Sequence, residues 1–144
     1  MKKAIFTISL IVVALLGFNA TAVAQEVGGD KGPKIEVDKE VHDYGTINQG
    51  DNGECVFVVK NTGTEPLILS RCKGSCGCTV PSCPQEPIAP GASAEIKVKY
   101  DTNRVGPINK SVSITSNATN EPNKVIRIKG NIKAKAVESP SPEK

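Results

Sequence analysis

Four of the five cysteines in this chain lie within one short segment, at Cys72, Cys76, Cys78 and Cys83. Cysteines at this spacing can pair as disulfides, bind a metal ion through their thiolates, or exchange disulfides with other thiols. The segment is therefore the first candidate site, and these three chemistries are three hypotheses about its function.

Disulfide pairing is the structural interpretation of the cluster. A bridge from Cys72 to Cys83 would close a Gly- and Pro-rich connection between two strands and would stabilise the fold by about 2–4 kcal/mol. Cys76 and Cys78 would then bridge each other in a small ring. Four cysteines allow three connectivities, however, and the spacing does not choose among them. On this interpretation the protein needs no cofactor.

Metal binding is the alternative interpretation. Thiolates are the ligands that Cu(I) and Zn(II) prefer, and the four clustered cysteines together could hold one such ion. Their spacing differs from the two separated C-x2-C pairs of common zinc sites. Disulfide exchange is the third hypothesis, because the cationic Arg71 and Lys73 beside the cluster favour thiolate formation, although a thioredoxin-type C-x-x-C pair is absent from the sequence.

Outside the cluster, the sequence offers no catalytic group together with its partners. Cys55 alternates with Phe57 and Val59, which predicts a buried free thiol that behaves as a small apolar residue. The single histidine, His42, is followed by Asp43, but neighbours on a strand point to opposite faces. The sequence contains no recognisable carboxylate pair, nucleophile elbow or phosphate-binding glycine loop. We therefore expect a protein that is not an enzyme.

The first 24 residues predict a signal peptide. Lys2 and Lys3 precede an uncharged apolar run over residues 4–18, and a small-x-small site predicts cleavage between Ala24 and Gln25. The run is shorter than the ~20 residues that a spanning helix needs, so we expect no membrane span after cleavage. Export to the periplasm or out of the cell is the predicted location. Cleavage leaves 16 basic and 15 acidic residues, a balance that argues against nucleic acid as the partner.

Period-two alternation of apolar and polar residues dominates the mature chain and predicts an all-β fold. The clearest example is Ala94 to Tyr100, where apolar residues alternate with charged ones. We expect one domain over residues 34–134, between a flexible lead-in at 25–33 and a disordered tail at 135–144. About seven antiparallel strands, at 35–38, 41–47, 54–60, 66–71, 94–101, 109–115 and 125–132, predict an immunoglobulin-like β-sandwich.

Several short motifs resemble a known bacterial family. They include His42-Asp43-Tyr44-Gly45-Thr46-Ile47, Asn61-Thr62-Gly63, Ser75-Cys76-Gly77-Cys78-Thr79 and Pro87-Ile88-Ala89-Pro90-Gly91. Over about residues 35–132 the chain resembles the secreted domain-of-unknown-function family 1573, which is similar to Hydin-type and major-sperm-protein-type immunoglobulin-like modules. The resemblance implies the same fold and a role as a binding or scaffold module, without an assigned activity. Cys55, Cys72 and Cys83 lie outside the motifs of the family.

The partner expected on this basis is an unidentified protein or a component of the cell envelope. The cysteine loop and exposed strand edges are the parts of the domain that we expect to make the contact, because an unpaired strand edge can bind another chain.

Overall fold

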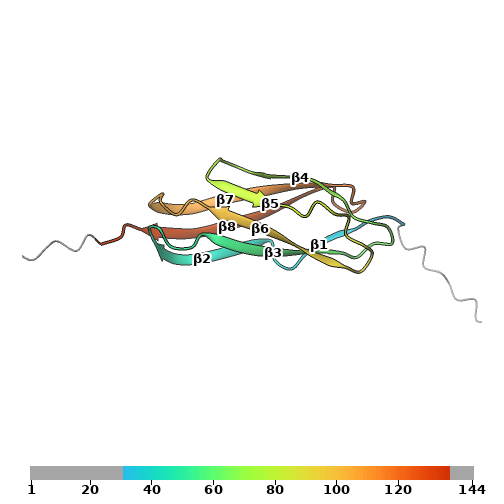
Figure 1. Cartoon of the computed structure of the whole chain (residues 1–144), viewed down its shortest axis with the longest axis horizontal. Helices are drawn as coiled ribbons and strands as arrows, with labels where there is room; N and C mark the ends of the chain where they lie inside the picture. Colours follow the sequence, from blue (N-terminus) through green and yellow to red (C-terminus); the bar gives the residue numbers. More distant parts are fainter. Residues whose placement is uncertain (1–30, 137–144) are drawn as a thin grey trace, which may run out of the picture.

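Two four-stranded β-sheets pack face to face in the computed structural model, which describes residues 31–136 (Figure 1). The strands are β1 (Ile35–Val37), β2 (Val41–Asn48), β3 (Glu54–Asn61), β4 (Leu69–Gly74), β5 (Thr79–Ser82), β6 (Ser93–Tyr100), β7 (Gly106–Ser116) and β8 (Asn123–Lys133). The first sheet has the order β1-β3-β6-β5 and the second has the order β2-β8-β7-β4. This arrangement confirms the predicted all-β sandwich.

The alternating apolar residues form the core between the sheets, as the sequence predicts. Phe57, Ile96, Ile114 and Ile126 are all fully buried, and each contributes about 1.5–3 kcal/mol through the apolar surface that it removes from water. In β6 and β8, charged residues take most of the positions that alternate with the buried ones and face solvent. The alternation therefore decides which side of each strand faces the core.

The eighth strand and one parallel pairing differ from the prediction. The extra strand is β5, which lies inside the cysteine segment that was expected to be a connection; its four residues include Pro81, which hides the strand signal. β2 runs parallel to β8, with Val41 opposite Arg127 and Ile47 opposite Ile132, whereas the other strand pairs in residues 31–136 are antiparallel. Strands that pair across most of the chain give no local signal of their direction.

Two boundaries also differ. The strand expected at 66–71 begins at Leu69, because Leu67 pairs only with Ile88 in an isolated bridge before the chain enters the second sheet. Gly32 and Pro33, which were expected in the flexible lead-in, are buried, and the Pro33 carbonyl accepts a hydrogen bond from the Thr119 backbone N–H at 2.8 Å.

The predicted signal peptide (1–24), its cleavage site between Ala24 and Gln25, and most of the lead-in and tail lie outside the described residues. Within residues 31–136, no helix has the length and apolar character needed to cross a bilayer.

The order of the strands leaves four edges, two on each side of the sandwich. β1 and β2 are the edges on one side, and β4 and β5 are the edges on the other. The chain passes directly from β4 to β5, so the cysteine segment is the link that joins the two sheets on this side (Figure 1).

Candidate functional site

The Cys72–Cys83 disulfide ties the two sheets together at their edges. Cys72 lies in β4, in the second sheet, and Cys83 follows β5, in the first sheet; their Cα atoms are 6.1 Å apart. The cysteine segment is therefore more than the Gly- and Pro-rich connection between two strands that the sequence predicts. It consists of two edge strands and the turn between them, and a covalent bond joins its ends.

The turn between β4 and β5 is tightly packed. A Cβ atom on Gly74 would overlap the carbonyl oxygen of Thr79, so only glycine allows the two strands to approach this closely. The Ser75 N–H donates to the Ser111 carbonyl at 2.8 Å, and the Asp101 N–H donates to the Cys78 carbonyl at 2.9 Å. Hydrogen bonds to β7 and to the end of β6 thus hold the turn from both sheets.

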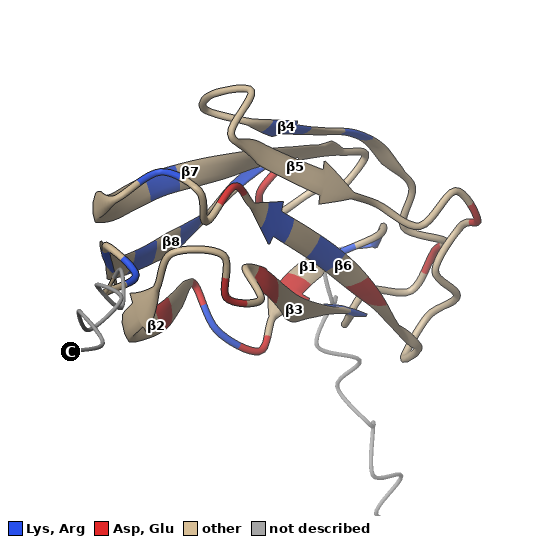
Figure 2. Ribbon diagram, turned by 60° about the vertical axis from the view of Figure 1, so that its left-hand side comes forward, with Lys and Arg blue, Asp and Glu red and all other residues tan. Residues whose placement is uncertain are grey.

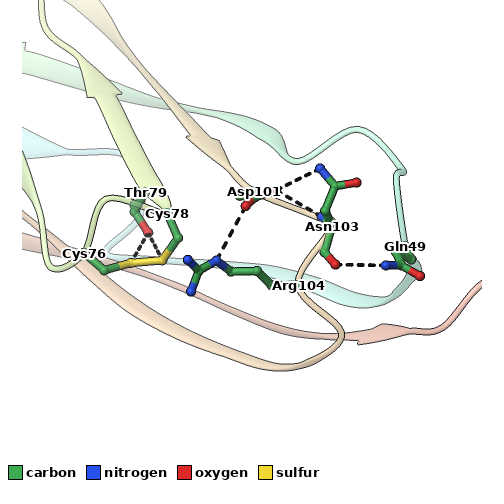
Figure 3. A network of polar contacts seen from close by, with 7 residues as sticks. All are labelled: Gln49, Cys76, Cys78, Thr79, Asp101, Asn103 and Arg104. Atoms are coloured by element: carbon green, nitrogen blue, oxygen red, sulfur yellow. Dashed lines mark hydrogen bonds and ion pairs between the residues drawn. A yellow bond between two sulfur atoms is a disulfide. The ribbon is translucent and has the colours of Figure 1, made fainter.

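The second disulfide, Cys76–Cys78, lies at the tip of this turn, with Cα atoms 5.2 Å apart. Cys78 is buried and Cys76 is partly exposed. The hydroxyl of Thr79, a residue that is only 2% exposed, lies 3.6 Å from the Cys76 sulfur and 3.8 Å from the Cys78 sulfur. Figure 3 shows this hydroxyl directed at the disulfide.

A polar network continues from the turn into the loop after β6. The Asp101 carboxylate accepts hydrogen bonds from Asn103 and forms an ion pair with Arg104 at 3.5 Å. The Asn103 backbone hydrogen bond, followed by the Asn103 amide, lowers the pKa of Asp101 below its usual range. Arg104 extends towards the Cys76–Cys78 disulfide in Figure 3, and Gln49 joins the network by donating to the Asn103 carbonyl at 3.0 Å.

An open polar hollow of about 300 Å³ lies beside the Cys72–Cys83 disulfide, between β4 and β5. It is lined by both cysteines and by neighbours that include Arg71, Ser82 and Gln85. In this structure all four clustered cysteines are in disulfides, a form in which sulfur is not a thiolate ligand. No group of three or more metal-ligating side chains gathers anywhere in residues 31–136.

Cys55 is the free cysteine of the described residues, and it lies in the core. Burial raises the pKa of its thiol, which therefore stays protonated at neutral pH. His42 also has a packing role: its ring meets the Tyr44 ring edge-on, with centroids 4.7 Å apart, and burial together with the Lys39 charge lowers its pKa. Asp43 forms an ion pair with Lys129 at 3.3 Å on the outer face of the sheet.

Three of the four strand edges are blocked, which limits the edge pairing expected from the sequence. Asn120 bonds both the N–H and the carbonyl of Ile35 in β1, at 2.9 Å each. In β2, the Asp43 carboxylate accepts from the Gly45 N–H and the Asp51 carboxylate accepts from the Asn48 N–H. β5 contains Pro81, which has no N–H to donate. Such features prevent the addition of another strand.

Lys and Arg residues are concentrated on β4, β7 and β8 of the second sheet (Figure 2), and most of them are exposed on its outer face. Arg71 and Lys73 on β4 flank the inward-facing Cys72, while Arg127, Lys129 and Lys133 take the exposed alternate positions of β8. β7 lies between these two strands and presents Ser111 opposite Arg127 and Ser113 opposite Lys73. A row of small polar side chains is therefore flanked by cations on both sides.

The two sheets differ sharply in charge. The strands of the second sheet carry seven Lys and Arg residues against one acid, Asp43, whereas the strands of the first sheet carry three of each sign. Neither the basic face nor the position of the Thr79 hydroxyl was predicted from the sequence. The alternation of Arg127 and Lys129 with Ile126 and Ile128 was a visible signal of the basic face, but its extent depends on which strands are neighbours.

Solved structures similar to this chain include PapD-like domains. A protein of unknown function from Porphyromonas gingivalis W83 matches with a TM-score of 0.63 and 20% identity, over 70% of this chain and 47% of that one, so the chain spans about half of its length. The ASH/PapD-like domain 7 of human CEP192 matches with a TM-score of 0.59 and 10% identity, over 72% of this chain and 87% of that domain. The YadV chaperone matches with a TM-score of 0.50 and 13% identity, over 74% and 54% of the two chains.

The likeness to the PapD-like domain, together with the two four-stranded sheets, confirms the predicted immunoglobulin-like sandwich. The comparison with curated proteins found no match. The family described as "Protein of unknown function (DUF1573)" matches residues 35–132, nearly all of the residues that the structure describes. The match agrees with the resemblance carried by the sequence motifs, and the chain belongs to this family.

Proposed function

We propose that the protein is an exported, non-enzymatic binding module that uses the basic outer face of the β2-β8-β7-β4 sheet to bind an acidic protein of the cell envelope. The observation that carries this proposal is the charge asymmetry between the two sheets. The signal-like pattern of residues 1–24 supports export to the periplasm or beyond the cell.

The charges on this face are available to a partner. Arg71, Lys73, Arg127 and Lys133 are all exposed and have no ion pair within the described residues, and Lys129 has only the exposed Asp43. Unpaired positive charges on one surface attract a negatively charged surface and accelerate its association. The serines of β7 between them can donate hydrogen bonds to carboxylates.

The cysteine segment fixes the position of a strand that forms part of this face. Cys72 points inward from β4 and is bonded to Cys83, so the disulfide fixes the strand that presents Arg71 and Lys73 on its outer side. A fixed strand loses less conformational entropy on binding than a mobile edge would. The disulfide-stapled loop is thus part of the proposed binding module, and it requires no metal.

Two triple variants with the same change in charge test the proposal. Arg71→Glu/Lys73→Glu/Arg127→Glu reverses the basic face, and Lys60→Glu/Lys97→Glu/Lys99→Glu makes the matched change on the first sheet. Retention on immobilised poly-L-glutamate, measured as the KCl concentration needed for elution, should fall for the first variant and much less for the second. Equal losses would mean that only net charge matters and would overturn the proposal.

Photo-crosslinking in the exporting cell tests the class of partner. A photoreactive residue at Ser113, in the centre of the basic face, should form an adduct with an acidic protein, and one at Ser93 on the first sheet should not. The adduct should disappear in the first triple variant and persist in the second. A nucleic-acid or polysaccharide adduct at Ser113, or a protein adduct that survives charge reversal, would contradict the proposal.

A further inference from the structure

We propose that the Cys76–Cys78 disulfide is an exchange site for a protein dithiol, whereas the Cys72–Cys83 disulfide is structural. The juxtaposition that carries this inference is the Thr79 hydroxyl, which is directed at both sulfurs of Cys76–Cys78 (Figure 3). The inference does not depend on the basic face, and either proposal can fail alone.

The Thr79 hydroxyl is buried without a good hydrogen-bond acceptor. Thr79 is 2% exposed, and within residues 31–136 the two disulfide sulfurs are the only hydrogen-bond partners of its hydroxyl. A buried polar group normally finds an oxygen or nitrogen partner, and the sulfur of a disulfide is a weak acceptor. A thiolate, in contrast, is charged and accepts hydrogen bonds strongly. The hydroxyl therefore matches the reduced site better than the oxidised one.

The two disulfides also depend differently on the fold. Cys72 and Cys83 are brought together from the edges of two sheets. The fold therefore stabilises this disulfide against reduction by as much as the disulfide stabilises the fold. Cys76 and Cys78 are separated by Gly77 alone and are neighbours even in an unfolded chain. Closing so short a loop removes little entropy from the unfolded chain, so the fold gives this bond little protection from reduction.

The different burial of the two cysteines sets the direction of attack. Cys76 is partly exposed and Cys78 is buried, so an incoming thiolate reaches the Cys76 sulfur. A bond forms between this thiolate and the Cys76 sulfur while the Cys76–Cys78 bond breaks, and Cys78 leaves as a thiolate that accepts a hydrogen bond from Thr79.

The second thiol of the dithiol completes the exchange. Its thiolate attacks the sulfur through which the dithiol is bound to Cys76, and Cys76 is released as a thiolate. Two electrons pass from the dithiol to the protein. The dithiol becomes a disulfide, and the two protons of its thiols end on Cys76 and Cys78. The co-reactant is thus a protein dithiol that is oxidised as it reduces this site.

The test reduces the native protein with dithiothreitol and follows the cysteines over time by alkylation and peptide mass spectrometry. Cys76 and Cys78 should be alkylated at least tenfold faster than Cys72 and Cys83. With glutathione, a monothiol of which one molecule carries out only the first step, the mixed disulfide should form on Cys76. Equal rates for the two disulfides, or a mixed disulfide on Cys78, would overturn the proposal.

Variants of Thr79 separate the exchange site from a merely accessible disulfide. Thr79→Val should slow reduction of Cys76–Cys78 by roughly tenfold, the loss expected for one hydrogen bond to a charged group. Thr79→Ser retains the hydroxyl and should restore the rate. The control variant Thr115→Val removes a hydroxyl on a different strand, β7, where it is hydrogen-bonded to Asn123. This variant should leave the rate unchanged. An unchanged rate in Thr79→Val, or no recovery in Thr79→Ser, would show that the hydroxyl has no role.

Discussion

Tyr44 illustrates how one polar atom can be satisfied inside an apolar environment. Its ring packs against His42, and its hydroxyl donates to the Gly53 carbonyl at 2.7 Å, which joins β2 to the turn before β3. Burial is the main cause that raises the pKa of Tyr44, and the neighbouring Cys55 thiol adds to the effect. The fold therefore requires the neutral phenol.

This requirement predicts a loss of stability in alkali that depends on Tyr44. An ordinary tyrosine has a pKa of about 10, so the contribution of Tyr44 is fully present below that pH and is lost as the pH rises above it towards the higher pKa of the folded state. Tyr44→Phe should cost about 0.5–1.5 kcal/mol at neutral pH, because one hydrogen bond is lost. Urea titrations from pH 7 to 11 should show the difference between wild type and variant shrinking above pH 10. A difference that is constant across this range would contradict the prediction.

At the scale of the element, the crossing from β4 to β5 depends on one glycine. Gly74 has no space for a Cβ atom against the Thr79 carbonyl, whereas a Cβ on Gly77 at the tip of the same turn would meet nothing within 4 Å. The two glycines are three residues apart but have different roles. Gly74 permits the two strands to come together, and Gly77 lies in open space.

A pair of alanine variants tests this distinction. Gly74→Ala should destabilise the protein by about 2 kcal/mol or more, because backbone atoms of β4 or β5 must move. Gly77→Ala should change stability by less than about 0.5 kcal/mol, since its backbone does not have a positive φ and its surroundings are open. Thermal denaturation of both variants provides the comparison. Similar losses in the two would mean that the turn as a whole, and not the close approach at Gly74, limits stability.

The sequence predicted elements where the signal is local and failed where it is not. The alternation in β3, β6 and β8 identified these strands and their buried faces. β5 was missed because four residues with a central proline carry no periodicity, and the direction of β2 relative to β8 has no local signature. Asn61 was noted only as part of a family motif, but it is a fully buried amide that donates to the Glu65 and Ile88 carbonyls.

The candidate site shows the same division. The cysteines were identified from their spacing, but the position of the Thr79 hydroxyl between the Cys76 and Cys78 sulfurs depends on how β4 and β5 approach each other. The basic face was missed because Arg71 and Arg127 are distant in sequence, and only the order β8-β7-β4 places them on one surface. Sheet order is a property of the whole chain, so local patterns could not supply it.

At the scale of the whole molecule, the sandwich has two different sides. On one side the connection between β1 and β2 joins the sheets through only three residues, and on the other the Cys72–Cys83 disulfide joins β4 to the residue that follows β5. The sheets are thus linked covalently at both of their open sides, and the basic face lies on the sheet that contains β2 and β4. The disulfide is the only one of these links that a reductant can remove.

The stability of the whole domain should therefore depend on Cys72–Cys83 far more than on Cys76–Cys78. Cys72→Ser/Cys83→Ser should lower the free energy of unfolding by about 2–4 kcal/mol, because the unfolded chain regains the freedom of the open loop. The same substitutions at Cys76 and Cys78 release a loop with one intervening residue and should cost much less. The first variant should also show a larger urea m-value, since an unfolded state without the crosslink exposes more surface. Urea unfolding of both variants measures these effects. Equal losses in the free energy of unfolding would place the structural role in the turn and would contradict the different roles assigned to the two disulfides.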